Sequence, residues 1–377
     1  MDALTTPSNW QRVRLGDILT LKHGRDYKNF KLGNIPVYGS GGYMLSINNF
    51  LHNGESVCIG RKGTIDKPIY LNGKFWVVDT LFYSYSFKKS IPKFIFYAFS
   101  IIKWSNYNEA TGVPSLTKMT ISNIEIPLPP LNEQIAIANI LSALDRYLYT
   151  LDALILKKES VKKALSFELL SQRKRLKGFN QNWQRVRLGT YKYRRGSFPQ
   201  PYGNPQWYSD NGMPFVQVYD VGENFKLNQK TKQKISKIAQ PMSVFVPKNS
   251  VIITLQGTIG RVALTQYDCY CDRTILIFDN NTLNDVNKYF FVLSLFTKFE
   301  EEKRKADGSI IKTITKQTLK DFEIPLPPLN EQIAIANILS DVDSEIISLK
   351  NKKRQFENIK KALNHDLMSA KIRVLKK

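Results

Sequence analysis

The segment EIPLPPLNEQIAIANILS, at residues 125–142, recurs letter for letter at residues 323–340. A second string, NWQRVRLG, occupies residues 9–16 and recurs at residues 182–189. Repeats this far apart are too long for a solenoid, whose periods reach about 50 residues. The chain therefore contains two copies of one unit, and each copy runs from NWQRVRLG through a globular body into IPLPPLNEQ and a helix.

The repeated segment also predicts where a long helix begins. Pro127, Pro129 and Pro130 exclude a continuing helix or a central strand, and Asn132 can cap the helix that follows. Beyond this point apolar residues recur at alternating spacings of four and three. They are Ile137, Leu141, Leu144, Leu148, Leu151, Ile155, Leu165 and Leu169 in copy one, and Ile335, Leu339, Val342, Ile346, Leu349, Phe356, Leu363 and Leu367 in copy two. At 1.5 Å per residue, roughly 40 residues give a rod of about 60 Å.

This heptad stripe predicts that the two helices pair with each other, as in a coiled coil. Lysines interrupt the stripe in both copies, at Lys158 and Lys162 and at Lys353 and Lys360. The alternative is that each helix lies with its apolar face on its own body. We favour mutual pairing, because both helices carry the same stripe and both must cover it.

The two bodies differ more than the helices do. The offset between the copies is 173 residues at NWQRVRLG, 194 at Gly63 and Gly257, and 198 from Leu116 and Ile314 onward. Most of the extra residues of copy two therefore enter early in its body. Runs rich in β-branched and aromatic residues predict strands at 76–87, 251–255, 262–264 and 274–278, and helices are predicted at 92–102 and 288–305.

Together these features predict an α+β fold with an internal pseudo-twofold repeat. Two mixed, mainly β globular domains are expected at residues 1–131 and 179–329. Two helices, at 132–178 and 330–377, are expected to separate the domains and to pair as an antiparallel coiled coil. At 377 residues the chain is long enough for two domains with a core each.

The charge of the chain predicts an acidic partner. Its formal net charge is +23 and its pI is about 9.7. Nucleic acid is the first class of partner that such an excess suggests, and an anionic membrane surface is the second. The chain has no run of about 18 apolar residues, and its first ten residues lack a signal-peptide pattern. We therefore expect a soluble, cytoplasmic protein.

The cysteines predict neither a disulfide framework nor a metal site. Cys58, Cys269 and Cys271 are an odd and sparse set. Only three histidines accompany them in the whole chain, and none lies at metal-ligand spacing from the Cys269 and Cys271 pair. We expect ordinary strand-borne thiols rather than a zinc site.

The chain runs twice through the same order of parts: a globular body, the string IPLPPLNEQ and a long helix. In this order it closely resembles the specificity subunit of type I restriction-modification systems. The resemblance covers essentially the whole chain. Local strings also resemble the target recognition domains of that family: NIPVYGSGG at 34–42, IGRKGT at 59–64 with Asp79 and Thr80, and QGTIGR at 256–261 with DRT at 272–274. The PLPPLNEQ string entering a helix, found twice, is the specific signal, whereas each loop string alone is weak.

The resemblance implies a division of labour. This subunit would select the DNA sequence, while modification subunits would carry S-adenosylmethionine and methylate adenine. Restriction subunits would use ATP and Mg to translocate and cut DNA. The implied partners are double-stranded DNA, two modification subunits and restriction subunits, with no membrane. No cofactor and no catalytic residue is expected in this chain itself.

Motifs that the chain lacks agree with a non-catalytic role. It contains no GxxxxGK(S/T) phosphate loop and no Asn/Asp-Pro-Pro-aromatic tetrapeptide of the kind adenine methylases use. Glu300, Glu301 and Glu302 near Lys303 could be taken for a nuclease site, but a solvated helix face is the expected interpretation. Three alternatives stay open: a specificity subunit of a methylation-only assembly, a self-contained DNA-modifying enzyme with degenerate motifs, and a basic scaffold that binds all DNA alike.

Two unlike bodies joined by a helical spacer predict a split, asymmetric DNA target with an unread gap, whose length the spacer would set. Arg and Gln can read base edges in the major groove, while Lys and Ser can contact phosphates. The candidates lie in or beside turns, and for each an ordinary surface side chain is the alternative. They are Arg25, Tyr38, Ser40, Arg61, Lys62, Ser115 and Lys118 in body one, and Arg194, Arg195, Gln217, Tyr219, Gln256, Arg261, Arg273, Lys312 and Lys316 in body two.

Two further groups have open interpretations. Trp76, Phe82, Tyr83 and Tyr85 are expected in the core rather than stacked on bases. Basic clusters at 157–158, 162–163, 173–175 and 350–354 either follow phosphates across the gap or only solvate the helix pair.

The letter-for-letter repeat predicts a surface that meets the same partner in both copies. The candidates for docking a modification subunit are Leu131, Glu133 and Gln134 in copy one and Leu329, Glu331 and Gln332 in copy two. The alternative is that these residues only end the preceding strand and start the helix.

Overall fold

The computed structural model of the chain describes residues 7–374, apart from 223, 258 and 306–315, and divides into two compact units. Unit 1 comprises Met1–Leu154 and Leu349–Lys377, and unit 2 comprises Ile155–Ser348. Each unit therefore combines one globular body with parts of both long helices. The predicted boundaries at residues 131, 178 and 329 divide bodies from helices instead, and they stay a prediction.

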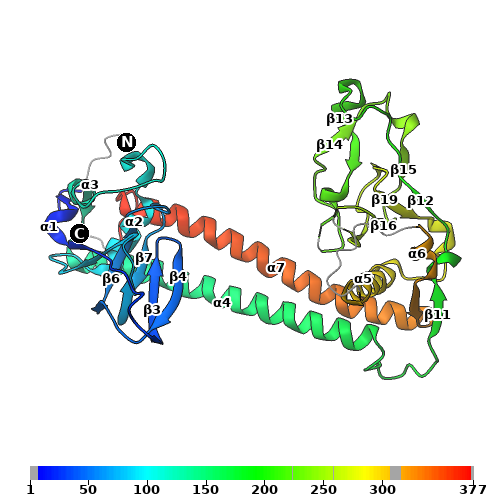
Figure 1. Cartoon of the computed structure of the whole chain (residues 1–377), viewed down its shortest axis with the longest axis horizontal. Helices are drawn as coiled ribbons and strands as arrows, with labels where there is room; N and C mark the ends of the chain where they lie inside the picture. The colour runs from blue at the N-terminus through cyan, green and yellow to red at the C-terminus, as the bar shows by residue number, and fades with distance from the viewer. Residues whose placement is uncertain (1–6, 223, 258, 306–315, 375–377) are drawn as a thin grey trace. The chain divides into compact units, whose positions relative to one another are not determined.

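The elements of copy one follow one another along the chain, and Figure 1 labels the larger ones. They are β1 (Gln11–Arg14), α1 (Leu15–Ile18), β2 (Thr20–His23), β3 (Leu32–Gly39), β4 (Gly42–Ile47), β5 (His52–Asn53), β6 (Ser56–Gly60), β7 (Ile69–Leu71), β8 (Lys74–Val77), β9 (Leu81–Tyr85), α2 (Pro92–Ile101), η1 (Trp104–Tyr107), α3 (Lys118–Asn123), β10 (Glu125–Leu128) and α4 (Leu131–Leu170). The strand predicted at 76–87 is two strands, β8 and β9, joined by a turn.

Copy two repeats this order with additional short turns of 3₁₀ helix. Its elements are β11 (Gln184–Arg187), η2 (Leu188–Thr190), β12 (Tyr193–Arg195), η3 (Pro205–Trp207), β13 (Tyr208–Val216), η4 (Val218–Asp220), β14 (Gln233–Ile235), η5 (Gln240–Met242), β15 (Val244–Val246), β16 (Val251–Thr254), β17 (Val262–Leu264), β18 (Cys269–Cys271), β19 (Ile275–Phe278), η6 (Asn280–Thr282), α5 (Lys288–Lys305), α6 (Lys316–Asp321), β20 (Glu323–Leu326) and α7 (Leu329–Met368). The helix predicted at 288–305 is confirmed as α5.

The two bodies have the same sheet topology, strand for strand. In unit 1 the sheet orders are β2-β9-β6-β7, β4-β3-β8-β5 and β1-β10; in unit 2 they are β12-β19-β16-β17, β14-β13-β18-β15 and β11-β20. The β3–β8 and β13–β18 pairs are parallel, and the other ladders are antiparallel. The predicted internal repeat is therefore confirmed at the level of strand order.

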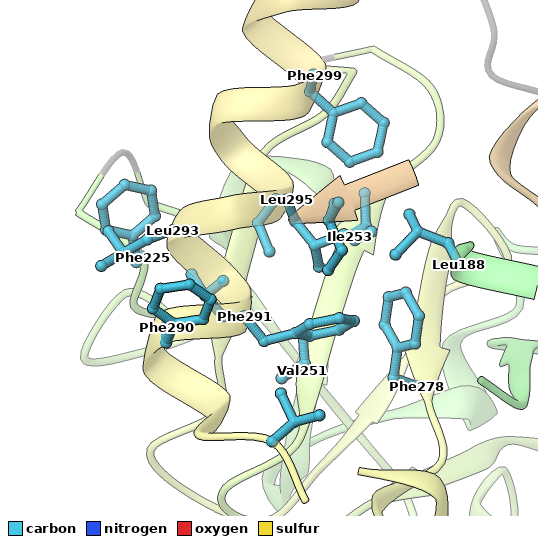
Figure 2. Packing of buried hydrophobic residues seen from close by; sticks show 14 of the residues in the cluster. Leu188, Phe225, Val251, Ile253, Phe278, Phe290, Phe291, Leu293, Leu295 and Phe299 are labelled. Atoms are coloured by element: carbon cyan, nitrogen blue, oxygen red, sulfur yellow. The ribbon is translucent and has the colours of Figure 1, made fainter. Parts of the chain in front are cut away.

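A helix packs on one sheet in each body and closes the main core. In unit 1 the helix is α2, which lies against β6 and β7. In unit 2 it is α5, from which Phe291 and Leu295 point toward Ile253 of β16 and Phe278 of β19 (Figure 2). The rings of Phe291 and Phe278 lie edge to face, with centroids 5.1 Å apart. Burying an aromatic side chain of this kind stabilises a fold by about 1.5–3 kcal/mol, which is why apolar residues recur along this helix.

The two repeated strings contact each other within each unit. NWQRVRLG supplies β1 and β11. IPLPPLNEQ supplies most of β10 and β20, with which β1 and β11 pair. The indole of Trp10 donates a hydrogen bond to Glu133 at 3.1 Å, and the indole of Trp183 donates one to Glu331 at 3.0 Å. The two strings therefore form one joint, present twice.

The long helices pair with each other inside both units, as the heptad stripe predicted. In unit 1, Tyr147 of α4 packs on Phe356 of α7 with ring centroids 4.7 Å apart. The lysines that interrupt the stripe pair with carboxylates of the opposite helix: Lys353 with Asp152 at 2.6 Å, Lys162 with Asp343 at 2.5 Å, Lys360 with Asp145, and Lys158 with Glu345. The interruptions are therefore part of the pairing.

Each helix also packs on a body, so the alternative interpretation holds for part of its length. Ile137 and Leu141 of α4 belong to the core of unit 1, and so do Leu367 and Met368 at the end of α7. The end of α4 likewise enters the core of unit 2. None of the helices in the described ranges has the length and apolar composition that a bilayer crossing requires.

Candidate nucleic-acid interface

In body one, the predicted DNA-contacting residues gather around the turn between β8 and β9. The backbone N–H of Arg25 donates to Val77 O at 2.9 Å, and Tyr38 O accepts from Val78 N at 2.9 Å. The N–H of Arg61 donates to Thr80 O at 2.8 Å. Residues separated by up to 55 positions in the sequence thus surround one short turn.

Two further segments join this turn. Ser40 N donates to Thr80 Oγ1 at 3.3 Å. Lys62 and Ser115 form an isolated antiparallel bridge, and Leu116 N donates to Arg61 O at 2.9 Å. Lys118 begins α3 directly beyond this bridge. All seven candidates of body one therefore lie in or next to one surface, which we call the body-one cluster.

A glycine makes the approach of Arg25 possible. A Cβ at Gly24 would lie 2.0 Å from Val78 O, and its equivalent Gly196 would meet Cys271 O at 2.2 Å. Real Cβ contacts are never this short, so only glycine lets these strands come so near the turn. In body one this places Arg25, the residue after Gly24, beside the turn, whereas the residue after Gly196 in body two is Ser197.

The cluster is positively charged and partly free for a ligand. The side chains of Arg25, Lys62 and Lys118 are exposed. The guanidinium of Arg61 donates to Asp79 O at 3.1 Å, which fixes one of its nitrogens. Arg and Lys on one face provide the electrostatic footprint expected for a phosphate-bearing ligand.

In body two, Asp272 organises the equivalent turn. Its N–H donates to Val216 O at 3.0 Å, and its Oδ1 accepts from Thr274 N at 2.8 Å. Its Oδ2 accepts from the hydroxyl of Tyr202, and burial, together with this bond, raises the pKa of that tyrosine. The exposed guanidinium of Arg273 lies 5.4 Å from the ring centroid of Tyr202, so the ring supports it by a cation–π contact.

Gln217 and Tyr219 lie in the segment that joins β13 to β14. Gln217 N and Lys232 N both donate to the carboxylate of Asp220 at 2.9 Å, so that residue closes the base of the segment. Asp220 is buried, and burial raises its pKa. The hydroxyl of Tyr219 donates to the side-chain oxygen of Gln217.

The remaining candidates of body two include exposed side chains and side chains that bond to neighbouring loops. Arg195 and Gln256 are exposed. Arg194 donates to Phe245 O at 3.2 Å and Arg261 donates to Val221 O at 3.1 Å, so both guanidinium groups also hold neighbouring loops in place. Lys316 begins α6, and Lys312 lies outside the described residues.

Of the residues proposed to dock a partner, the polar ones are buried and the leucines are exposed. Gln134 is fully buried, and its amide donates to Pro129 O at 2.8 Å and accepts from Ile91 N at 3.0 Å. Gln332 makes the matching bonds in unit 2. These two amides and the carboxylates of Glu133 and Glu331 are buried, and each is hydrogen-bonded within its own unit. Their burial does not fit direct contact with a partner.

The apolar members of the same segment remain accessible. Leu131 is 49% exposed and Leu329 is 41% exposed. Ile135 and Ile333, one helical turn further on, are exposed as well. Docking through the leucines stays a prediction, and the isoleucines are residues that the sequence analysis missed although they stand at the i+4 spacing.

The core aromatics and the basic helix clusters are also placed by the structure. Trp76, Phe82 and Tyr83 are buried as expected, and Tyr85 is half-buried. In the helix clusters, Lys158, Lys162 and Lys353 are engaged in ion pairs, and so is Arg175, with Glu331 at 2.8 Å. For the three lysines the structure shows a role in helix pairing, whereas Arg175 follows the end of α4 and binds the first turn of α7. The phosphate role stays a prediction for all four.

No metal centre emerges among the described residues. They contain no group of three or more His, Cys, Asp and Glu side chains suited to hold a metal ion. Cys58, Cys269 and Cys271 are all fully buried, and burial raises the pKa of the Cys58 thiol to about 12. These are inert core thiols.

Comparisons with known proteins agree with this architecture. A family model described as the type I restriction modification DNA specificity domain matches residues 7–159 and again residues 200–358. The chain is 25% identical over 426 aligned positions to the type I restriction enzyme MjaVIII specificity subunit of Methanocaldococcus jannaschii, covering 99% of this chain and 95% of that protein.

Solved structures share the fold. The S subunit of a type I restriction-modification system from M. genitalium superposes with a TM-score of 0.68 at 16% identity, covering 97% of both chains. A chain from a structure titled for the assembly and conformational transition of the type I restriction-modification system gives a TM-score of 0.57 at 16% identity, with 97% of this chain and 98% of that chain covered.

Proposed function

Because the chain belongs to the type I restriction-modification DNA specificity family, we propose that each of its two bodies reads one short element of a split duplex DNA target. The two elements differ in sequence, and a fixed unread gap separates them. The chain itself performs no chemistry, and its role is to direct partner subunits to that target.

The observation that carries this proposal is one topology bearing two different sets of exposed side chains. Around the Thr80 turn, body one presents Arg25 and Lys62. Around the Thr274 turn, body two presents Arg273 and Gln256. Arg pairs with guanine and Gln with adenine through bidentate hydrogen bonds in the major groove, where every base pair has a distinct pattern. Two bodies with the same topology and different exposed side chains favour an asymmetric target.

The proposed partners follow from the repeated segment. Two identical surfaces that expose Leu131 and Ile135 in one copy, and Leu329 and Ile333 in the other, would each accept the same modification subunit. That subunit would carry S-adenosylmethionine and methylate adenine, and restriction subunits would bring ATP, Mg and DNA cleavage. These cofactors would reside on the partners.

The test is to express this chain together with the modification subunit encoded beside it, and to map methylated adenines in host DNA. We expect one split, asymmetric motif, methylated on both strands. An unsplit motif would contradict the two-reader proposal, and a stable complex that methylates no motif and binds random DNA as tightly as any duplex would favour a basic scaffold.

A body exchange sharpens this test. Replacing body two by the body of another specificity subunit, with both joints left intact, is expected to change one half of the motif and keep the other. A matched pair of point variants supports it. Lys62→Ala should affect only the half read by body one, whereas Lys74→Ala should leave both halves unchanged, since Lys74 is exposed at the end of β8 away from the Thr80 turn. A chimera in which both halves changed would contradict modular reading.

A further inference from the structure

A tight hairpin in body one presents a tyrosine beside the body-one cluster. Strands β3 and β4 are joined by Ser40 and Gly41 alone, and Gly42 adopts a φ of +111° that suits glycine. Tyr43 follows at once and is 62% exposed. The bond from Ser40 N to Thr80 Oγ1 ties this hairpin tip to the turn around which the candidate residues gather.

The ring of Tyr43 is held in place although it is exposed. It lies edge to face with Tyr38, with centroids 6.0 Å apart. Its hydroxyl is hydrogen-bonded to Ser46 Oγ at 3.1 Å, within the same hairpin. The polar end of the side chain is therefore engaged locally, and the ring itself is the free surface.

The equivalent hairpin of body two reaches a similar arrangement by a different route. There β13 and β14 are joined by residues 217–232, which Asp220 closes at the base. Tyr219 is 42% exposed, and its hydroxyl is bound by Gln217 of the same segment. The ammonium of Lys232 lies 5.0 Å from its ring centroid. Two hairpins of different length thus each present a tyrosine with an engaged hydroxyl.

We infer that the rings of Tyr43 and Tyr219 contact base edges of the DNA and help to specify one or two base pairs in each half of the target. A two-stranded β-ribbon fits the major groove, and an apolar surface there distinguishes the methyl group of thymine. A ring that is already immobilised loses little conformational entropy on binding. This inference rests on the proposed reading of DNA by the two bodies.

The experiment uses the complex of the full chain with its modification subunit. Binding is measured by fluorescence anisotropy at one fixed salt concentration, on the target duplex, on duplexes with single base-pair changes, and on a random duplex. The variants are Tyr43→Ala, Tyr43→Phe, Tyr219→Ala and Tyr219→Phe. Leu32→Ala is the matched control, since Leu32 lies on the same hairpin, at the end away from the turn, and is also exposed.

We expect Tyr43→Ala to weaken binding to the target about tenfold and to remove discrimination at one or two adjacent base pairs of one half only. Tyr219→Ala should do the same in the other half. The two Phe variants and Leu32→Ala should stay within about twofold of the unchanged complex. Methylation motifs of the Ala variants should relax at the same positions.

Several results would overturn the inference. Equal loss on target and random DNA would mean a backbone contact, unchanged discrimination would mean no base contact, and a Phe variant as weak as Ala would assign the contact to the hydroxyl. If Tyr43→Ala lowers the melting temperature, Tyr43→Thr takes its place, because Thr favours strands. Failure of the unchanged complex to recognise a split motif would instead count against the proposed function.

Discussion

Removing the guanidinium of Arg373 is expected to destabilise unit 1 by about 2–4 kcal/mol. The carboxylate of Glu133 is 2% exposed and accepts hydrogen bonds from Arg373 at 2.8 and 3.1 Å and from Trp10 at 3.1 Å. Arg373→Ala leaves this buried charge to the indole of Trp10. Breaking a buried ion pair costs about 3–5 kcal/mol, and the 29% exposure of Arg373 lets water replace part of the loss.

Urea denaturation and thermal melting of the full chain measure this cost. A loss of about 3 kcal/mol lowers the melting temperature of a unit of this size by about 6–12 °C. Lys371→Ala, a neighbouring exposed position, is the control. The double variant Glu133→Gln with Arg373→Ala should lose less than the sum of its single changes, because the uncompensated charge is gone.

The twin of this ion pair provides an internal check. Arg175 and Glu331 stand 198 residues from Arg373 and Glu133, and they form the same bidentate pair, with Trp183 as the indole donor. Arg175→Ala should therefore destabilise unit 2 to a similar degree. The reasoning is refuted if Arg373→Ala costs no more than about 0.5 kcal/mol beyond Lys371→Ala, a change typical of ordinary surface sites.

Two further predictions concern the helix pair and the core. Lys158 and Glu345 occupy the positions in unit 2 that Phe356 and Tyr147 occupy in unit 1, and the ion pair is partly exposed. Lys158→Phe with Glu345→Tyr should therefore stabilise unit 2 by about 1 kcal/mol in urea denaturation, since aromatic pairs contribute about 0.5–1.5 kcal/mol and exposed ion pairs little; a loss of stability would show that the rings do not pack there. The Cys58 thiol, whose pKa burial raises to about 12, should resist thiol reagents at pH 8 and react once urea unfolds unit 1, and fast labelling of the folded chain would show that it is accessible.

Local patterns in the sequence predicted a large part of the fold. The spacing of apolar residues after Pro130 predicted α4 and α7, because a helix repeats its contacts every three to four residues along one continuous segment. The run at 288–305 predicted α5 for the same reason. The strand at 76–87 was wrong as a single element, because a turn of three residues inside an apolar run leaves the composition of that run unchanged.

The candidate site was predicted in parts. Glycine-rich strings indicated the turns near Ser40 and Lys62, and these turns are real. Their meeting at the Thr80 turn depends on the pairing of β3 with β8 and of β6 with β9, between residues up to 39 positions apart, which no local pattern encodes. Tyr43 was missed because an exposed aromatic residue looks the same in sequence as a buried one, and only its place at a hairpin tip distinguishes it.

The sequence alone determined the duplication, the long helices and the family, because identical strings and periodic spacing are properties of the chain itself. Only the tertiary structure decided whether Glu133 and Glu331 are exposed or buried. The repeat suggested that these carboxylates meet a partner. Each is instead buried against a tryptophan and an arginine that are distant from it in the sequence and belong to the same unit. Burial is a property of the folded surface, so a repeated charged residue can be exposed or internal, and only the packing of distant segments determines which.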